Sequence, residues 1–277
     1  MSASASAADR GASRPSSRAP IAILVALSAL YLPLRYMMES ESVSDALYNG
    51  AYLYGTALQI VLAAVIIAVA VTVGMKQSIG RQWLLIGVGV SLYALGDVTW
   101  TMFDLFLGID PYPSIADVFY TAEYVFFVAA MVLAIRAYSG LVKTRTPIII
   151  GATLAVIGVA IVYFVLLKPY IFAEGVAGLG LWGFVVSTLY PVGDIALMLA
   201  PAVALALVVR QLGAGRLARP WWLVVVGALV FALVDSFFVY AEWAGTGLTP
   251  AMDMGYVLAN LLFACAALVA KDAYRVG

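Results

Sequence analysis

The chain has 277 residues, of which 65% are hydrophobic and 11% are charged, and its mean hydropathy is +1.04. This composition excludes a soluble domain of this size, and the continuous apolar runs exclude a transmembrane β-barrel, whose strands alternate. The net charge is zero, there is no histidine, and Cys265 is the single cysteine. We therefore predict an all-α polytopic membrane protein without His-ligated haem or zinc, without Ser–His or Cys–His catalysis, and without an intrachain disulfide.

Residues 1–20 are rich in Ser, Ala and Arg, which predicts a disordered cytoplasmic tail. Arg10, Arg14 and Arg18 precede the first apolar run, and no small-residue cleavage site follows it, so we interpret this run as a retained signal anchor. Eight apolar stretches long enough to span a membrane follow, near residues 21–38, 50–75, 82–106, 115–137, 147–167, 184–209, 220–243 and 252–270.

The loop charges predict the orientation of these eight spans. One side carries Arg10, Arg14, Arg18, Lys76, Arg81, Arg136, Lys143, Arg145, Arg210, Arg216, Arg219, Lys271 and Arg275. The other side carries only Arg35 and Lys168. Because cytoplasmic loops are enriched in Lys and Arg, both termini are predicted to be cytoplasmic. The acids show the opposite bias, and most lie in or beside the outer loops.

The second half of the chain repeats the first. Residues 81–97, "RQWLLIGVGVSLYALGD", match residues 219–235, "RPWWLVVVGALVFALVD", at a separation of 138. After the following loop the separation becomes 136, which pairs Tyr120 with Tyr256. We predict two tandem four-helix repeats, residues 21–140 and 141–277, related by an axis along the membrane normal. Chance similarity between Leu- and Val-rich helices is the alternative.

Four carboxylates lie inside predicted spans: Asp97, Glu123, Asp194 and Asp235. The helical rise places all four at a similar depth, in the outer half of the membrane. A carboxylate facing lipid there costs about 2–3 kcal/mol, so we expect these groups to face the bundle interior or water.

Aromatic residues are frequent in the same layer, and they include Tyr48, Tyr52, Tyr54, Trp100, Phe103, Phe119, Tyr120, Tyr124, Tyr190, Phe238, Tyr240 and Tyr256. Acids and aromatic faces together suit a cation, either organic or metallic. We predict a ligand site formed by Asp97, Trp100, Glu123, Tyr190, Asp194 and Asp235. The alternatives are a structural polar network and an interfacial aromatic belt.

The loop "GIDPYPSIADVFY" has a structural explanation of its own. Pro111 and Pro113 favour extended or turn geometry, and Ser114 with Asp117 forms a pattern like a capping box. The segment "LTPAMD" gives Asp253 a similar role. For both aspartates we favour helix capping over ligand contact.

Residues 96–120, "GDVTWTMFDLFLGIDPYPSIADVFY", resemble part of the N-terminal membrane modules of bacterial, especially actinobacterial, signalling proteins. Those modules have a Gly-Asp-x-x-Trp span followed by a "PYPS-x-AD-x-x-Y" loop, and they usually precede a GGDEF or GGDEF–EAL domain or a histidine kinase. The resemblance implies a sensory or membrane-anchoring role coupled to cyclic-di-GMP or phosphorelay output. Because the sequence ends soon after the last span, we expect output through a separate cytoplasmic partner.

Three functions compete. A sensory, receptor-like module that binds an outer ligand is favoured, and the protein is then not an enzyme. A transporter or channel would use the tandem repeats and buried acids, but the inner halves of the spans carry no charge. An intramembrane aspartyl protease is suggested by Gly96-Asp97 and Gly193-Asp194, although the first glycine of the "GxGD" motif is missing.

The prediction is therefore a multi-pass cell-membrane protein with no cofactor and no nucleic-acid partner. Its ligand and any bound metal are unidentified at this stage. The lipid bilayer, a separate signalling protein and a second copy of the chain are the candidate partners.

Overall fold

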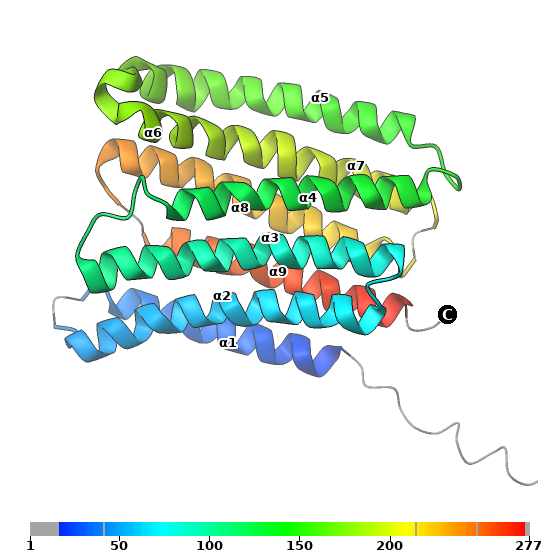
Figure 1. The fold of residues 1–277 in the computed structure, drawn as a ribbon, viewed down its shortest axis with the longest axis horizontal. Coiled ribbons are helices and arrows are strands. Elements are labelled where there is room, and N and C mark those ends of the chain that lie inside the picture. Colours follow the sequence, from blue (N-terminus) through cyan, green and yellow to red (C-terminus); the bar gives the residue numbers. More distant parts are fainter. Residues whose placement is uncertain (1–16, 41, 214, 248, 275–277) are drawn as a thin grey trace, which may run out of the picture.

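The computed structural model describes residues 17–40, 42–213, 215–247 and 249–274, and all regular structure within them is helical. The helices lie side by side along one direction (Figure 1). Residues 1–16 of the predicted tail lie outside the described residues, and the first helix already begins at Arg18.

The first half of the chain forms α1 (Arg18–Met37), α2 (Asp45–Val73), α3 (Ser78–Thr101), the π-helical segment η1 (Met102–Leu107) and α4 (Ala116–Tyr138). The second half forms α5 (Arg145–Val162), the π-helical segment η2 (Tyr163–Ile171), α6 (Phe172–Gly193), the π-helical segment η3 (Asp194–Leu199), α7 (Ala200–Arg210), α8 (Arg219–Ala244) and α9 (Pro250–Tyr274).

Local sequence explains several helix boundaries. The Ser44 side chain accepts a hydrogen bond from the backbone N–H of Leu47 and so caps α2. Gly74 (φ 105°) ends α2 and Gly245 (φ 67°) ends α8, in conformations that favour glycine. The proline Pro250 begins α9, where its missing N–H costs nothing.

Seven helical runs among the described residues are long and apolar enough to cross a membrane. One of them, Arg145–Arg210, contains 66 residues. A straight helix of that size would be about 100 Å long, which is roughly three times the thickness of the hydrocarbon core. Gly175 and Gly180 are not helical, and α6 runs back beside α5 (Figure 1). This run therefore folds back on itself, and both spans predicted near 147–167 and 184–209 fall within it.

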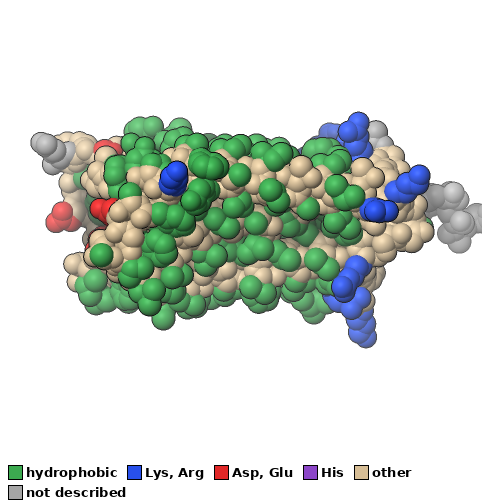
Figure 2. Space-filling view, turned by 90° about the horizontal axis from the view of Figure 1, so that it is seen from above, with side chains coloured by type: hydrophobic (Ala, Val, Ile, Leu, Met, Phe, Trp, Pro, Cys, Tyr) green, Lys and Arg blue, Asp and Glu red, His purple; other side chains and the backbone are tan. Residues whose placement is uncertain are grey.

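Most charged side chains gather at the two ends of the bundle, with an apolar belt between them, and one Lys or Arg side chain lies within the belt toward the end that carries the acids (Figure 2). The end with α1's last residues carries acids such as Glu39 and Asp110, and we call it the acidic end. The other end carries Lys76, Lys143 and Arg216, and we call it the basic end. The described termini meet there, where the Ser17 hydroxyl donates to the Leu268 carbonyl (2.9 Å).

Aromatic residues that the sequence predicts to be equivalent contact each other along the bundle. The ring centroids of Trp83 and Trp221 are 5.3 Å apart. Contacts at 5.0–6.0 Å join the further equivalent pairs Tyr93–Phe231, Trp100–Phe238 and Phe127–Phe263. These contacts join the two halves of the chain along the bundle, and the division into two repeats stays a prediction.

Two apolar cores result. The larger core fills the middle and the basic end, and it includes Ile66, Ile86, Val90, Met131 and Leu205, all essentially without exposure. The smaller core lies at the acidic end between η2, α6 and α8. We call it the acidic-end apolar cluster, and it consists of Val162, Leu166, Leu167, Ile171, Val186, Tyr190, Phe238 and Val239.

Candidate ligand-binding cavity

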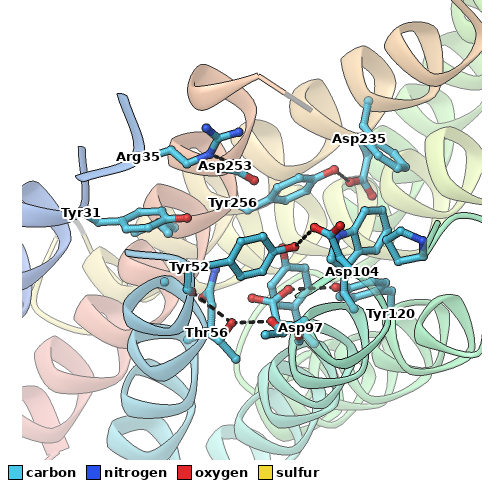
Figure 3. Close-up of a pocket in the computed structure, with 18 of the residues that line it drawn as sticks. Tyr31, Arg35, Tyr52, Thr56, Asp97, Asp104, Tyr120, Asp235, Asp253 and Tyr256 are labelled. Atoms are coloured by element: carbon cyan, nitrogen blue, oxygen red, sulfur yellow. Dashed lines mark hydrogen bonds and ion pairs between the residues drawn. The ribbon is translucent and has the colours of Figure 1, made fainter. Parts of the chain in front are cut away.

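A cavity of about 410 Å³ opens at the acidic end (Figure 3). Residues from α1, α2, α3, η1, α4, α6, α8 and α9 line it, together with Pro111 from the loop after η1. Its volume lies in the range of small-molecule sites, which is about 300–1,000 Å³.

The cavity is strongly acidic. The charged residues that line it are one arginine, Arg35, and six acids: Glu39, Asp97, Asp104, Asp235, Glu242 and Asp253. Glu39 and Asp104 are exposed, whereas Asp235 is only 4% exposed. The acids therefore extend from the mouth of the cavity to its interior.

Tyrosine hydroxyls hold three of these carboxylates. Tyr120 donates to Asp97 Oδ1 (2.9 Å), and Tyr256 donates to Asp235 Oδ1. At the mouth, Tyr52 donates to Asp104 Oδ2 (2.7 Å) (Figure 3). These bonds orient the carboxylates while leaving most of their acceptor positions available, since a carboxylate has about four.

The Gly-Asp dipeptide has a packing reason. A Cβ atom at Gly96 would lie 2.4 Å from the Tyr120 ring. Only glycine therefore lets Tyr120 approach α3 closely enough to reach Asp97 one residue later. A similar close contact joins α8 and α9, but there the glycine lies on the second helix of the pair. A Cβ atom at Gly255 on α9 would lie 2.3 Å from the Val234 side chain on α8.

Aromatic rings surround the interior acids. The Tyr93 ring lies 5.0 Å from the Tyr120 ring and 5.9 Å from the Tyr256 ring, measured between centroids. Phe231 contacts both Tyr93 and Tyr256. All four rings line the cavity. Such faces attract cations electrostatically and also cover hydrocarbon chains.

Arg35 forms an ion-paired group at the mouth. Its guanidinium donates to Asp253 on α9 and to Glu39 in the turn after α1. Asp253 therefore ties α1 to α9 and lines the cavity. The capping interpretation of Asp253 did not anticipate this contact, because it considered only the local sequence around "LTPAMD".

For Asp117 the structure shows part of the predicted capping pattern, although the residue at the N-cap of α4 is Ile115 and not Ser114. Asp117 Oδ2 accepts a hydrogen bond from the backbone N–H of Ser114 (2.6 Å), at the start of α4. Its Oδ1 also accepts one from the Tyr190 hydroxyl, so this fully buried carboxylate links α4 to α6. Tyr112 in the loop before α4 is hydrogen-bonded to Ser187 on α6 (2.7 Å), and burial raises the pKa of the Tyr112 phenol above its ordinary value.

The six predicted site residues separate into two groups. Asp97, Trp100, Tyr190 and Asp235 line the cavity. Glu123 and Asp194 are buried and are not among the lining residues. The Tyr124 hydroxyl donates to Asp194 Oδ1 (2.7 Å), while Asp194 Oδ2 and Glu123 Oε1 are buried without a hydrogen-bond partner.

Several lining residues were not predicted. Thr56 and Thr101 form a hydrogen bond between their hydroxyls (2.8 Å), and Gln59 accepts one from Asn260 (3.1 Å). The signal that could have found them is helical spacing, because Tyr52, Thr56 and Gln59 lie on one face of α2.

The described residues include no group of three or more Asp, Glu, Cys or His side chains placed to hold a metal ion. The carboxylates are instead distributed around an aromatic interior, which suits an organic cation. No protein-family model, curated protein or solved structure matches this chain. The resemblance of residues 96–120 to bacterial signalling modules therefore stays a prediction.

Proposed function

We propose that the protein is a sensory, receptor-like module of the cell membrane that binds a cationic ligand in this cavity and signals to a separate cytoplasmic protein. The observation that carries the proposal is the cavity lining, with six carboxylates and one arginine around tyrosine and phenylalanine rings. A cation binds such a lining through ion pairs and aromatic faces together.

The proposed topology has eight crossings, four in each repeat, with both termini in the cytoplasm. The run Arg145–Arg210 supplies two of these crossings, because it folds back near Gly175 and Gly180. Lys76, Lys143 and Arg216 lie at the basic end, which the positive-inside rule assigns to the cytoplasm. The cavity then opens to the outside.

Cysteine labelling tests this topology. Cys265 is buried and is first replaced by alanine. Single cysteines at Asp110 and Glu174 are expected to react with an impermeant thiol reagent on intact cells, and cysteines at Lys143 and Arg216 only after permeabilisation. Labelling of the position 216 variant on intact cells would contradict the orientation.

A receptor is favoured over a transporter by what lies below the cavity. Ile86, Val90, Phe127 and Met131 are fully buried and apolar, and they close the bundle toward the basic end. A transport path requires polar or broken-helix features through the whole thickness of the membrane. The transporter remains the second candidate because acids are buried beside the cavity floor, at Glu123 and Asp194.

Uptake measurements separate these two functions. Reconstituted proteoliposomes should retain a bound amine at the stoichiometry of the protein and should not accumulate it in the lumen. Accumulation that rises with time beyond that stoichiometry would favour the transporter.

An aspartyl protease would need Asp97 and Asp194 to share one catalytic space. Asp97 lines the cavity, whereas Asp194 is fully covered and bound by Tyr124. The geometry therefore favours binding over proteolysis.

The binding proposal is tested by thermal stabilisation of the purified protein with panels of amines, divalent cations, carboxylates and neutral compounds. Amines should stabilise the wild type, and the Asp97→Asn and Asp235→Asn variants should fold but respond less. Glu174→Gln is the control, since Glu174 is exposed and does not line the cavity. An equal response of the wild type and both aspartate variants would make these acids structural.

The proposal also includes a cytoplasmic output partner, which is inferred from the resemblance of residues 96–120 to bacterial signalling modules. Genes for a cyclase, a histidine kinase or a response regulator next to this gene would support it. Co-purification of their products with the full chain, stronger or weaker with the amine present, would test it directly.

A further inference from the structure

Four of the six cavity acids form two pairs at equivalent positions of the predicted repeats. Asp97 corresponds to Asp235, and Asp104 corresponds to Glu242, in both cases at a separation of 138 residues. All four residues line the same cavity. If the two halves are related by a two-fold axis, each half contributes the same two carboxylate positions to the cavity.

The other two acids already have a cationic partner. Arg35 binds both Glu39 and Asp253, and it is the only basic residue among those that line the cavity in the described part of the chain. The acids without a cationic partner are therefore the two equivalent pairs.

The interior pair, Asp97 and Asp235, has matching surroundings. A tyrosine hydroxyl donates to Oδ1 of each carboxylate, from Tyr120 in one case and from Tyr256 in the other. The Tyr93 ring contacts both of these tyrosine rings. Two anionic groups thus lie on either side of a shared aromatic surface.

Two further acids lie close to this pair but outside the cavity. Asp194 is a close neighbour of Asp235 and accepts a hydrogen bond from the Tyr124 hydroxyl (2.7 Å). Asp194 and Glu123 are buried and do not line the cavity. The anchors of a ligand are therefore to be found among the acids that line the cavity.

We propose that the ligand is a linear organic dication of the alkyl diamine class. One ammonium group binds Asp97, the other binds Asp235, and the hydrocarbon chain lies against Tyr93 and Phe231. This inference rests on the proposed function and specifies its ligand. A divalent metal would need its carboxylates in one coordination group, and the described residues do not form one.

Titration calorimetry on the purified full-length chain in nanodiscs tests the inference. The probes are linear diamines from diaminopropane to diaminooctane, together with the monoamines of the same chain lengths. A second charge-assisted contact should lower Kd about tenfold or more relative to the matched monoamine. Because two fixed carboxylates favour one span, the affinity of the diamines should also pass through an optimum with chain length.

Variants then identify the two anchors. Asp97→Asn and Asp235→Asn should each reduce the best diamine to the affinity of its monoamine, and the double variant should abolish binding. Glu174→Gln should change nothing. The comparison of diamines with monoamines uses wild-type protein alone, so it decides the question even if a variant misfolds.

The outcomes separate this inference from the proposed function. Equal affinity for monoamines and diamines would overturn the dication and leave a monocation cavity. Loss of binding in only one of the two aspartate variants would also overturn it, because a single anchor would then suffice. Failure of every amine to bind the wild type would overturn both the inference and the proposed cationic ligand.

Discussion

The cavity and the acidic-end apolar cluster occupy the same end of the bundle but have opposite character. Tyr52 lines the cavity at its mouth, and its predicted counterpart Tyr190 stands at the border of the two regions, since it lines the cavity and also belongs to the cluster. Thr56 and Gln59 on α2 correspond to Asp194 and Leu197 on η3. Thr56 and Gln59 line the cavity, whereas Asp194 is buried behind its wall and Leu197 is exposed.

The covering elements account for the difference. On the cavity side, α1 and the turn after it contribute Arg35 and Glu39, which are charged and form an ion pair at the mouth. On the cluster side, η2 contributes Leu166, Leu167 and Ile171, which are buried. Filling a space with apolar side chains stabilises the fold, whereas a polar space serves binding. The comparison teaches that the character of the covering segment, charged at the end of α1 and apolar in η2, separates the open space from the filled one.

The largest difference between the two regions should appear on removal of apolar side chains. Leu167→Ala in the cluster should lower the free energy of unfolding by about 2–5 kcal/mol, because it creates a cavity in a packed core. Met38→Ala, at the half-buried cavity wall, should cost less than about 1 kcal/mol. Denaturation of the purified variants measures both values. Similar losses at the two positions would mean that the cavity wall is packed like the cluster.

A smaller effect should distinguish the two corresponding tyrosines. Tyr190→Phe removes the donor to the fully buried Asp117 carboxylate and should cost about 1–3 kcal/mol of stability. Tyr52→Phe removes the donor to the exposed Asp104 carboxylate, where water replaces the hydroxyl, and should cost less than about 0.5 kcal/mol. Equal melting temperatures for the two variants would remove this distinction.

The smallest expected effect concerns the cavity alone. Arg35→Gln releases Glu39 and Asp253 from their ion pairs and should tighten amine binding about three- to tenfold at low salt. The gain should shrink as salt rises, because screening weakens interactions between partly exposed charges. Lys168→Gln is the control, since Lys168 does not line the cavity. Weaker binding in the Arg35 variant would instead make Arg35 part of the binding geometry.

Much of the fold could be predicted from the sequence because apolar runs and loop charges are local signals. The structure confirms that the regular structure of the described residues is helical, with seven runs long and apolar enough to cross a membrane. The division of the chain into two repeats stays a prediction. The sequence could not predict the π-helical segments η1, η2 and η3, since apolar composition does not distinguish them from α-helix.

The candidate site could be predicted only in part. Depth along a helix indicated that Asp97 and Asp235 lie in the same layer, and both line the cavity. Depth alone does not give the direction in which a side chain points, and Glu123 and Asp194 at a similar depth lie behind the wall. The charge of Arg35 indicated only the side of the membrane on which it lies. Its contact with Asp253 could not be predicted, because the two residues are 218 positions apart in the sequence.

The central claim is that an acidic cavity opens to the outside on the α2 side but not at the corresponding position of η3. The direct measurement is the rate at which single cysteines at Thr56 and Asp194, in a Cys265→Ala background, react with cationic and anionic methanethiosulfonates applied to intact cells. The account predicts that Thr56→Cys reacts about tenfold faster with the cationic reagent, because the cavity carboxylates concentrate cations, and that Asp194→Cys is protected. Equal rates for the two reagents at Thr56→Cys, or reaction only after permeabilisation, would contradict it.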